Sequence, residues 1–73
     1  MIIVSSPMQQ NEITELLTGY NGGDFTFRFK EKGGIRLFFE VTGDSREAAR
    51  KARELIKSTP WGAILYFQSI AAE

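Results

Sequence analysis

The sequence predicts one α+β domain in the order strand, helix, strand, strand, helix, strand. Two observations indicate this order. The period of the apolar residues changes along the chain between about 3.6, typical of a helix, and two, typical of a strand. Turns that contain glycine or proline fall at these changes. A chain of 73 residues suits one small domain, so we expect residues 1–73 to fold as a single unit.

The first third of the chain predicts a buried strand followed by a helix. Residues 1–4 are apolar, which predicts a short strand over residues 1–5. Ser6 and Pro7 are typical of a helix start, with Gln9 at the position of a capping-box partner. Gly19 is expected to end the helix, and residues 21–24 to form a turn. The apolar stripe of this helix consists of Ile13, Leu16, Leu17 and Tyr20.

The middle of the chain predicts a β-hairpin. Apolar and polar residues alternate over residues 25–30 and again over residues 35–41, with glycines between the two runs. A register that pairs Phe27 with Phe39 keeps apolar residues opposite one another and leaves residues 32–34 as the loop. The same register places Arg28 opposite Phe38, within reach of a cation–π contact.

The last third of the chain predicts a second helix and a final strand. Asp44 is the expected N-cap of a helix over residues 45–58, and Glu47 stands where a capping box has its acidic partner. Pro60 prevents the helix from continuing, and residues 61–68 are predicted as the strand. The apolar stripe of this helix consists of Ala48, Ala52, Leu55 and Ile56.

Right-handed crossovers place both helices on one face of a four-stranded antiparallel sheet with strand order 4-1-3-2. This element order resembles the ferredoxin-like βαββαβ two-layer sandwich over nearly the whole chain. The resemblance implies the fold alone, because that superfold carries many unrelated functions.

The other face of this sheet has no element of the chain to cover it. Exposed apolar patches of roughly a few hundred Å² are typical of interaction sites. We therefore expect contact with another protein, or with a second copy of the chain as a homodimer. Side-chain alternation predicts an apolar centre of Ile3, Phe38, Ile64 and Tyr66 on this face, with a polar rim of Arg28, Arg36 and Glu40.

Composition argues against several classes of function. The chain has no Cys and no His, which excludes disulfides, thiolate or imidazole metal sites and histidine general bases. Nine basic residues balance nine acidic ones, so the overall charge does not favour nucleic acid or anionic membranes. No apolar run reaches the ~18 residues that cross a bilayer, and no signal-peptide pattern is present. We expect a cytoplasmic, non-enzymatic protein without metal or cofactor.

Two alternative functions stay open. One is the binding of single-stranded nucleic acid such as RNA, either by the open sheet face or by a basic stripe on the second helix. The simpler interpretation of that stripe is a solvated helix face. That stripe consists of Arg46, Arg50, Arg53 and Lys57. The element order is also similar to that of small-molecule-binding regulatory modules of the ACT type. Their ligand loop corresponds here to residues 5–8, which lack the usual glycine.

Overall fold

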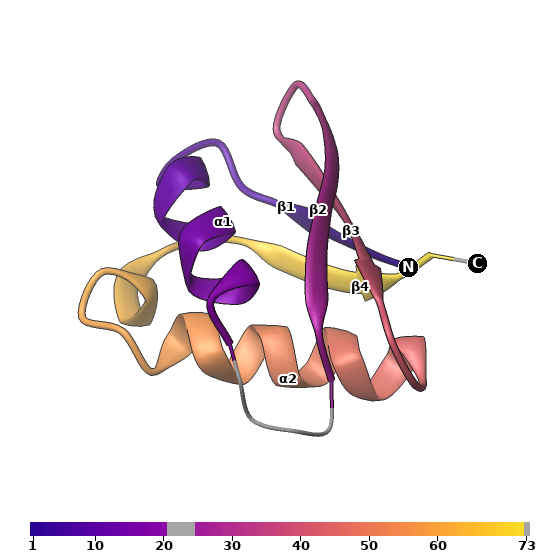
Figure 1. Cartoon of the computed structure of the whole chain (residues 1–73). Coiled ribbons are helices and arrows are strands. Elements are labelled where there is room, and N and C mark those ends of the chain that lie inside the picture. Colours follow the sequence, from indigo (N-terminus) through magenta and orange to yellow (C-terminus); the bar gives the residue numbers. More distant parts are fainter. Residues whose placement is uncertain (21–24, 73) are drawn as a thin grey trace.

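The predicted order of strands and helices is confirmed (Figure 1). The computed structural model describes residues 1–20 and 25–72, so the turn expected at residues 21–24 lies outside the described residues. Within these ranges the strands are β1 (Ile2–Ser5), β2 (Phe27–Gly33), β3 (Arg36–Val41) and β4 (Gln68–Ala71). The helices are α1 (Gln10–Thr18) and α2 (Ser45–Lys57), and a 3₁₀ helix, η1 (Gly62–Ile64), precedes β4.

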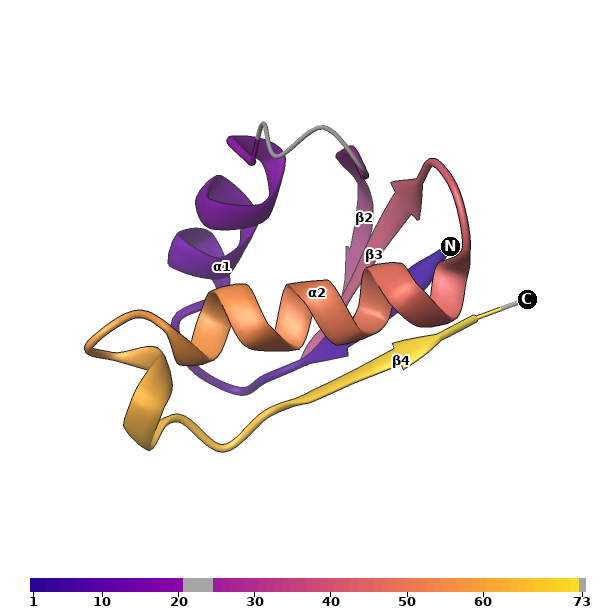
Figure 2. The ribbon, with the colours of Figure 1, turned by 90° about the horizontal axis from the view of Figure 1, so that it is seen from below.

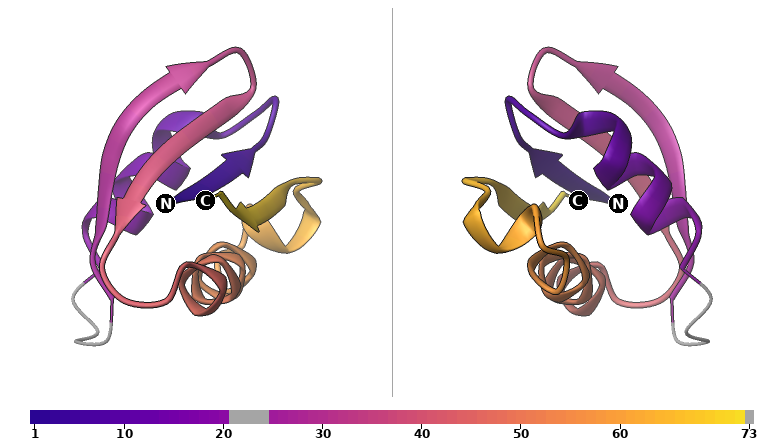
Figure 3. Two further views of the ribbon diagram at one scale, coloured as in Figure 1. Left: turned by 90° about the vertical axis from the view of Figure 1, so that its right-hand side faces the viewer. Right: turned by 90° about the vertical axis from the view of Figure 1, so that its left-hand side faces the viewer.

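The strands form one antiparallel sheet in the order β2-β3-β1-β4, which is the predicted arrangement. Figures 2 and 3 show α2 running along β4 and β1, while α1 packs beside β2. Both helices bury their apolar stripes against the same face of the sheet. The fold is therefore a ferredoxin-like two-layer α+β sandwich.

Alternate residues of each strand form the core between the sheet and the helices. On β1, Ile2 and Val4 are fully buried, whereas Ile3 between them is directed to the opposite face. On β3, Phe39 is fully buried and meets the ring of Phe29 edge-on at a centroid distance of 5.7 Å. Burial of such side chains is the main stabilising contribution, at roughly 25 cal/mol per Å² of apolar surface.

The first helix begins later than predicted. The main-chain N–H of Ser6 donates to the carbonyl of Ile35 (2.8 Å), so Ser6 continues the sheet and does not cap a helix. Its hydroxyl closes a turn by donating to the Met8 carbonyl (2.6 Å). Gln9 then adopts a left-handed conformation with φ of 59°, and α1 starts at Gln10. Gly19 ends the helix, as predicted.

The register of the hairpin differs from the prediction by two residues. Phe29, and not Phe27, lies opposite Phe39, and a two-residue turn of Gly34 and Ile35 joins the strands. Gly34 has a φ of 62°, a conformation that favours glycine. Lys30 has no partner on β3 and forms a β-bulge. Because the shift is an even number of residues, the residues ahead of the bulge keep their predicted faces.

The second helix is close to the prediction. One carboxylate oxygen of Asp44 accepts hydrogen bonds from the main-chain N–H groups of Arg46 (2.8 Å) and Glu47 (3.3 Å). These contacts satisfy donors that the first helical turn would otherwise leave unpaired. The carboxylate of Glu47 lies 4.0 Å from the guanidinium of Arg50. The helix ends at Lys57, one residue earlier than expected.

The prediction of a final strand over residues 61–68 is wrong. The chain first turns through η1, where the Thr59 hydroxyl donates to the Ile56 carbonyl (2.7 Å) and accepts from the Gly62 N–H (2.8 Å). Gly62 is buried, and a Cβ there would lie 1.7 Å from the Ile56 carbonyl oxygen. Only glycine permits this close approach of the two main-chain segments. The chain then reaches the sheet at Gln68, where β4 begins.

Candidate interaction surface

The sheet face opposite the helices carries a row of three apolar side chains. Ile3 of β1 lies opposite Phe38 of β3 on one side and opposite Ile70 of β4 on the other. Ile70 is 51% exposed, and Ile3 and Phe38 are half-buried. These three residues are named here the open-face cluster. Since α1 and α2 both lie on the other side of the sheet, neither helix shields the cluster from solvent.

The ring of Phe38 is supported by a bare main chain on the neighbouring strand. A Cβ built on Gly33 of β2 would lie 3.6 Å from Cε1 of Phe38, an ordinary van der Waals contact. On β2 the ring of Phe38 thus lies near Gly33, which has no side chain, while Glu31 is the residue directly opposite Phe38. The alternation of Arg36, Phe38 and Glu40 with buried Leu37 and Phe39 directs the ring to the open face.

Charged residues flank Phe38 along β3 and across to β2. Arg36 and Glu40 stand two residues before and two residues after Phe38, on the same face of the strand. Arg28 of β2 lies opposite Glu40, and not opposite Phe38 as the predicted register required. Within residues 1–20 and 25–72, none of these three side chains makes an ion pair within 4.0 Å. Their charges are therefore available to a partner surface.

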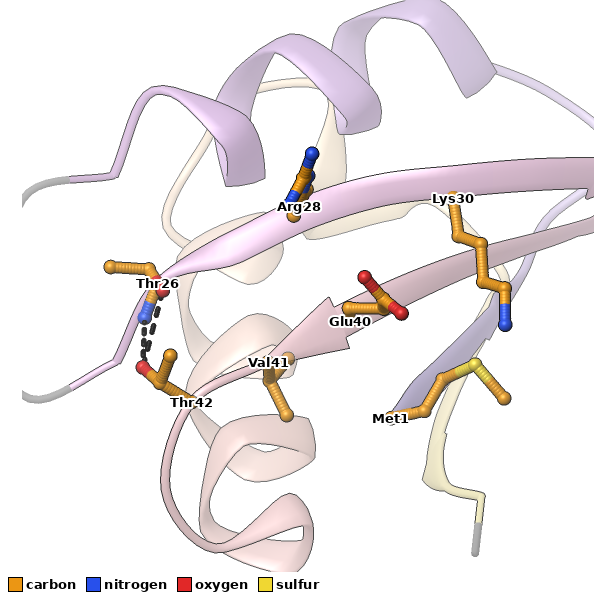
Figure 4. Close-up of a pocket in the computed structure, with 7 residues that line it drawn as sticks. All are labelled: Met1, Thr26, Arg28, Lys30, Glu40, Val41 and Thr42. Atoms are coloured by element: carbon orange, nitrogen blue, oxygen red, sulfur yellow. Dashed lines mark hydrogen bonds between the residues drawn. The ribbon is translucent and has the colours of Figure 1, made fainter.

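A hollow of about 600 Å³ lies beside this charged rim (Figure 4). Figure 4 shows the Glu40 carboxylate between the side chains of Arg28 and Lys30, with the side chain of Met1, the residue before β1, directed toward Lys30. The lining of the hollow includes both basic and acidic residues. It is therefore better suited to a partner surface of mixed charge than to an ion of one sign. Its lining consists of Met1, Thr26, Arg28, Lys30, Glu40, Val41 and Thr42.

The prediction that Ile64 and Tyr66 belong to the apolar centre is wrong, because neither residue lies on a strand. Ile64 is 89% exposed on η1. Tyr66 is 83% exposed and lines a cleft of about 210 Å³ with Ile35, at the end of the sheet. Ser5 and Pro7, from the loop compared with ACT modules, line the same cleft.

Ile70 is the member of the open-face cluster that the sequence did not reveal. It lies in the segment Gln68–Ala71, which has a single large apolar residue and therefore no visible alternation. Only the structure shows the alternation, in which Phe67 and Ser69 are half-buried whereas Gln68 and Ile70 are exposed. In the observed register Ile70 lies beside Ile3. The prediction expected Ile64 and Tyr66 of the final strand near this position.

The basic stripe of α2 is present, and three of its four residues line a groove while the fourth does not. All four residues of the stripe are exposed. Arg46, Arg50 and Arg53 line a groove of about 390 Å³ between α2 and β4, whereas Lys57 does not. The other residues of the groove are Ala49, Ser69, Ile70 and Ala71. Three cations thus lie along the outer strand of the sheet, whereas helical periodicity alone predicts only a charged helix face.

Comparisons and other kinds of site add no further assignment. No family model, curated protein or solved structure matches this chain. Among the described residues, no three acidic side chains lie close enough together to hold a metal ion. Over the same ranges, neither helix has the length and apolar character needed to cross a bilayer.

Proposed function

We propose that this chain is a small non-enzymatic interaction module that pairs with a second copy of itself through the open sheet face. The observation that supports this most is the open-face cluster, a row of Ile3, Phe38 and Ile70 across three adjacent strands. Burial of this row between two copies removes apolar surface from water, which stabilises a dimer by roughly 25 cal/mol per Å². The zero formal charge of the chain means that two copies meet without long-range repulsion.

The charges on β3 favour one arrangement of the two copies. A two-fold axis that runs midway between the two sheets, perpendicular to β3 and directly over Phe38, sets the two β3 strands antiparallel, in sheets about 10 Å apart. Arg36 of each copy then faces Glu40 of the other, because these residues are equally far from Phe38. A two-fold axis parallel to β3 would instead bring Arg36 against Arg36. The two Arg36–Glu40 contacts therefore favour the antiparallel arrangement, in which Glu31, opposite Phe38 on β2, faces the same residue of the other copy.

The competing functions have less support. Phe38 is the one aromatic residue that the described strands direct to the open face, whereas RNA-binding sheets use several aromatic side chains to stack two or three bases. The cleft beside the loop that corresponds to the ACT ligand site measures about 210 Å³. Ligand pockets usually measure about 300–1,000 Å³, so this cleft is small for a regulatory ligand.

The experiment that tests self-association is solution mass as a function of concentration, measured by sedimentation. We expect the wild type to form dimers at micromolar concentrations and Phe38→Asp to be monomeric, because the carboxylate would be buried without a partner. Ile64→Asp is the matched control, since Ile64 is 89% exposed and lies outside the open face. Circular dichroism verifies that both variants keep the fold.

Two results would contradict the proposal. One is a wild type that stays monomeric at concentrations of several hundred micromolar, roughly the weakest range relevant to a specific homodimer. The other is a dimer that Phe38→Asp and Ile64→Asp weaken equally. Chemical-shift changes at Ile3 and Phe38 upon addition of a short RNA would instead favour the nucleic-acid alternative.

A further inference from the structure

Among residues 1–20 and 25–72, no strand pairs with the outer edge of β4. The N–H of Ala72 donates to the carbonyl of Met1 (2.8 Å), and Ile70 lies opposite Ile3 in the same ladder. In an antiparallel pair every second residue hydrogen-bonds to the neighbouring strand. The main-chain groups of Ile70 and Ala72 are therefore turned toward β1. Those of Ser69 and Ala71 point outward, away from the sheet.

The two edges of the sheet differ in how they resist pairing. The β2 edge has a bulge at Lys30 and lysines at positions 30 and 32. Bulges and lysines on an edge strand both discourage the addition of another strand. The β4 edge, Gln68–Ala71, has no lysine, no proline and no bulge. Among the described strands, β4 is therefore the edge open to another strand.

The groove described above lies directly beside this edge. Ser69 and Ala71, the two residues with outward main-chain groups, line it together with Arg46, Arg50 and Arg53. Within the described ranges one ion pair touches this row, between Arg50 and Glu47 at 4.0 Å, and it is largely exposed. Exposed pairs of this kind are weak. The groove thus combines strand-type hydrogen-bonding groups with excess positive charge.

We infer that this groove binds an extended acidic segment of a partner protein, which adds to the sheet as a fifth strand beside β4. The main chain of the segment pairs with the N–H and C=O groups of Ser69 and Ala71. Its side chains alternate between two faces, so acidic residues at every second position meet the arginines of α2. The groove shares Ile70 with the open-face cluster, but its arginines and its strand edge lie outside that cluster, so the inference does not depend on self-association.

Two other occupants suit the groove less well. If two copies paired through β4 about a two-fold axis, their α2 helices would bring two rows of arginines side by side, and like charges would repel. A nucleic-acid backbone offers acceptors but few donors, so it would not match the alternating N–H and C=O groups of Ser69 and Ala71. No aromatic residue lines the groove to stack on a base.

The probe that tests this inference is a fluorescent peptide of roughly eight residues that alternates Glu with Val, long enough to span β4. Binding is measured by fluorescence anisotropy at low salt. We expect Arg50→Glu to weaken binding by about tenfold or more, because an attractive charge becomes a repulsive one beside the peptide. Lys57→Glu is the matched control, since it makes the same charge change in the same stripe outside the groove. It should change the affinity by less than about twofold.

A second comparison tests the strand pairing itself. The same peptide with N-methyl groups on alternate residues keeps its charge but loses the donors that pair with β4. We expect it to bind at least about tenfold more weakly, and we expect the unmodified peptide to slow hydrogen exchange at the Ser69 and Ala71 amides. Phe38→Asp should leave peptide binding unchanged, which separates this inference from self-association.

Three outcomes would overturn the inference. The first is equal weakening by Arg50→Glu and Lys57→Glu, which would indicate attraction to the whole stripe. The second is undiminished binding of the N-methylated peptide, which would indicate charge without strand pairing. The third is a ten-nucleotide uridine RNA that binds as tightly as the peptide and depends on Lys57, which would assign the stripe to nucleic acid.

Discussion

The Ser69 hydroxyl donates a 2.8 Å hydrogen bond to the main-chain carbonyl of Ala49, and this bond joins β4 to α2. Ser69 lies on the helix side of β4, opposite Val4 of β1. Ala49 is a small, buried residue that lets the helix and the strand approach closely. The bond therefore holds the helix-side face of β4 against α2, in the register that β4 has with β1.

Removal of this hydroxyl should loosen β4. We expect Ser69→Ala to lower the free energy of unfolding by roughly 1 kcal/mol, measured by urea denaturation. Ser58→Ala is the control, since the Ser58 hydroxyl bonds to the Leu55 carbonyl within the exposed end of α2. Its effect should stay below about 0.5 kcal/mol. Equal losses in the two variants would show that the bond between β4 and α2 has no special importance.

Charge reversal on β3 tests the geometry of the proposed dimer. We expect Arg36→Glu and Glu40→Arg each to raise the dimer dissociation constant about tenfold, because each sets like charges against each other twice. The double variant restores both attractive contacts and should return close to the wild-type value. An equimolar mixture of the single variants should form mixed dimers, measured by native mass spectrometry. Homodimers of the single variants as tight as wild type would rule out the antiparallel arrangement.

Gly62 should tolerate no side chain. A Cβ at this position would lie 1.7 Å from the Ile56 carbonyl oxygen and 2.5 Å from the Thr59 hydroxyl oxygen. We expect Gly62→Ala to lower the free energy of unfolding by roughly 2–4 kcal/mol, measured by thermal or urea denaturation. At Gly33 a Cβ would make only an ordinary contact of 3.6 Å, so Gly33→Ala should be neutral or slightly stabilising. A stable Gly62→Ala protein would mean that η1 does not hold this close approach.

Neutralisation of Glu47 should strengthen the binding of the acidic peptide. Its carboxylate lies 4.0 Å from the Arg50 guanidinium and offsets part of that charge. We expect Glu47→Gln to tighten peptide binding by roughly twofold, since exposed ion pairs are weak. Glu54→Gln removes the same charge from the same helix outside the groove and serves as the control in fluorescence anisotropy. An unchanged affinity for Glu47→Gln would indicate that Arg50 does not meet the peptide.

The faces of β1 and β3 could be predicted from sequence because side-chain alternation has a period of two. Alternation places Ile3 and Phe38 on the open face wherever the strands begin. The hairpin register was wrong by two residues, since apolar pairing alone does not locate the bulge at Lys30. Arg28 kept its face and changed its partner, from Phe38 to Glu40.

The final strand could not be predicted because a local pattern competed with tertiary contacts. Residues 63–67 are apolar and aromatic, as in a buried strand, yet the packing of Gly62 against the Ile56 carbonyl and the hydrogen bonds of Thr59 bend the chain there. The strand that forms instead has one large apolar residue, Ile70. Its position depends on the Ser69 contact with a helix 20 residues earlier, which no local window contains.

The division of the basic stripe was likewise beyond the sequence. Helical periodicity groups Arg46, Arg50, Arg53 and Lys57 on one side of α2, and the structure agrees. Which of them lie beside β4 depends on how the helix crosses the sheet. That crossing is set by long-range packing of the alanines of α2, which periodicity does not report.

The bulge at Lys30 also limits how large any assembly of this chain becomes. Growth of a continuous intermolecular sheet requires every molecule to offer two receptive borders, one for the copy before it and one for the copy after it. In the part of the chain that the structure describes, the bulge and its lysines obstruct one border, and the arginines along the other repel an identical neighbour. Concentrated solutions should therefore contain discrete particles and no fibrils.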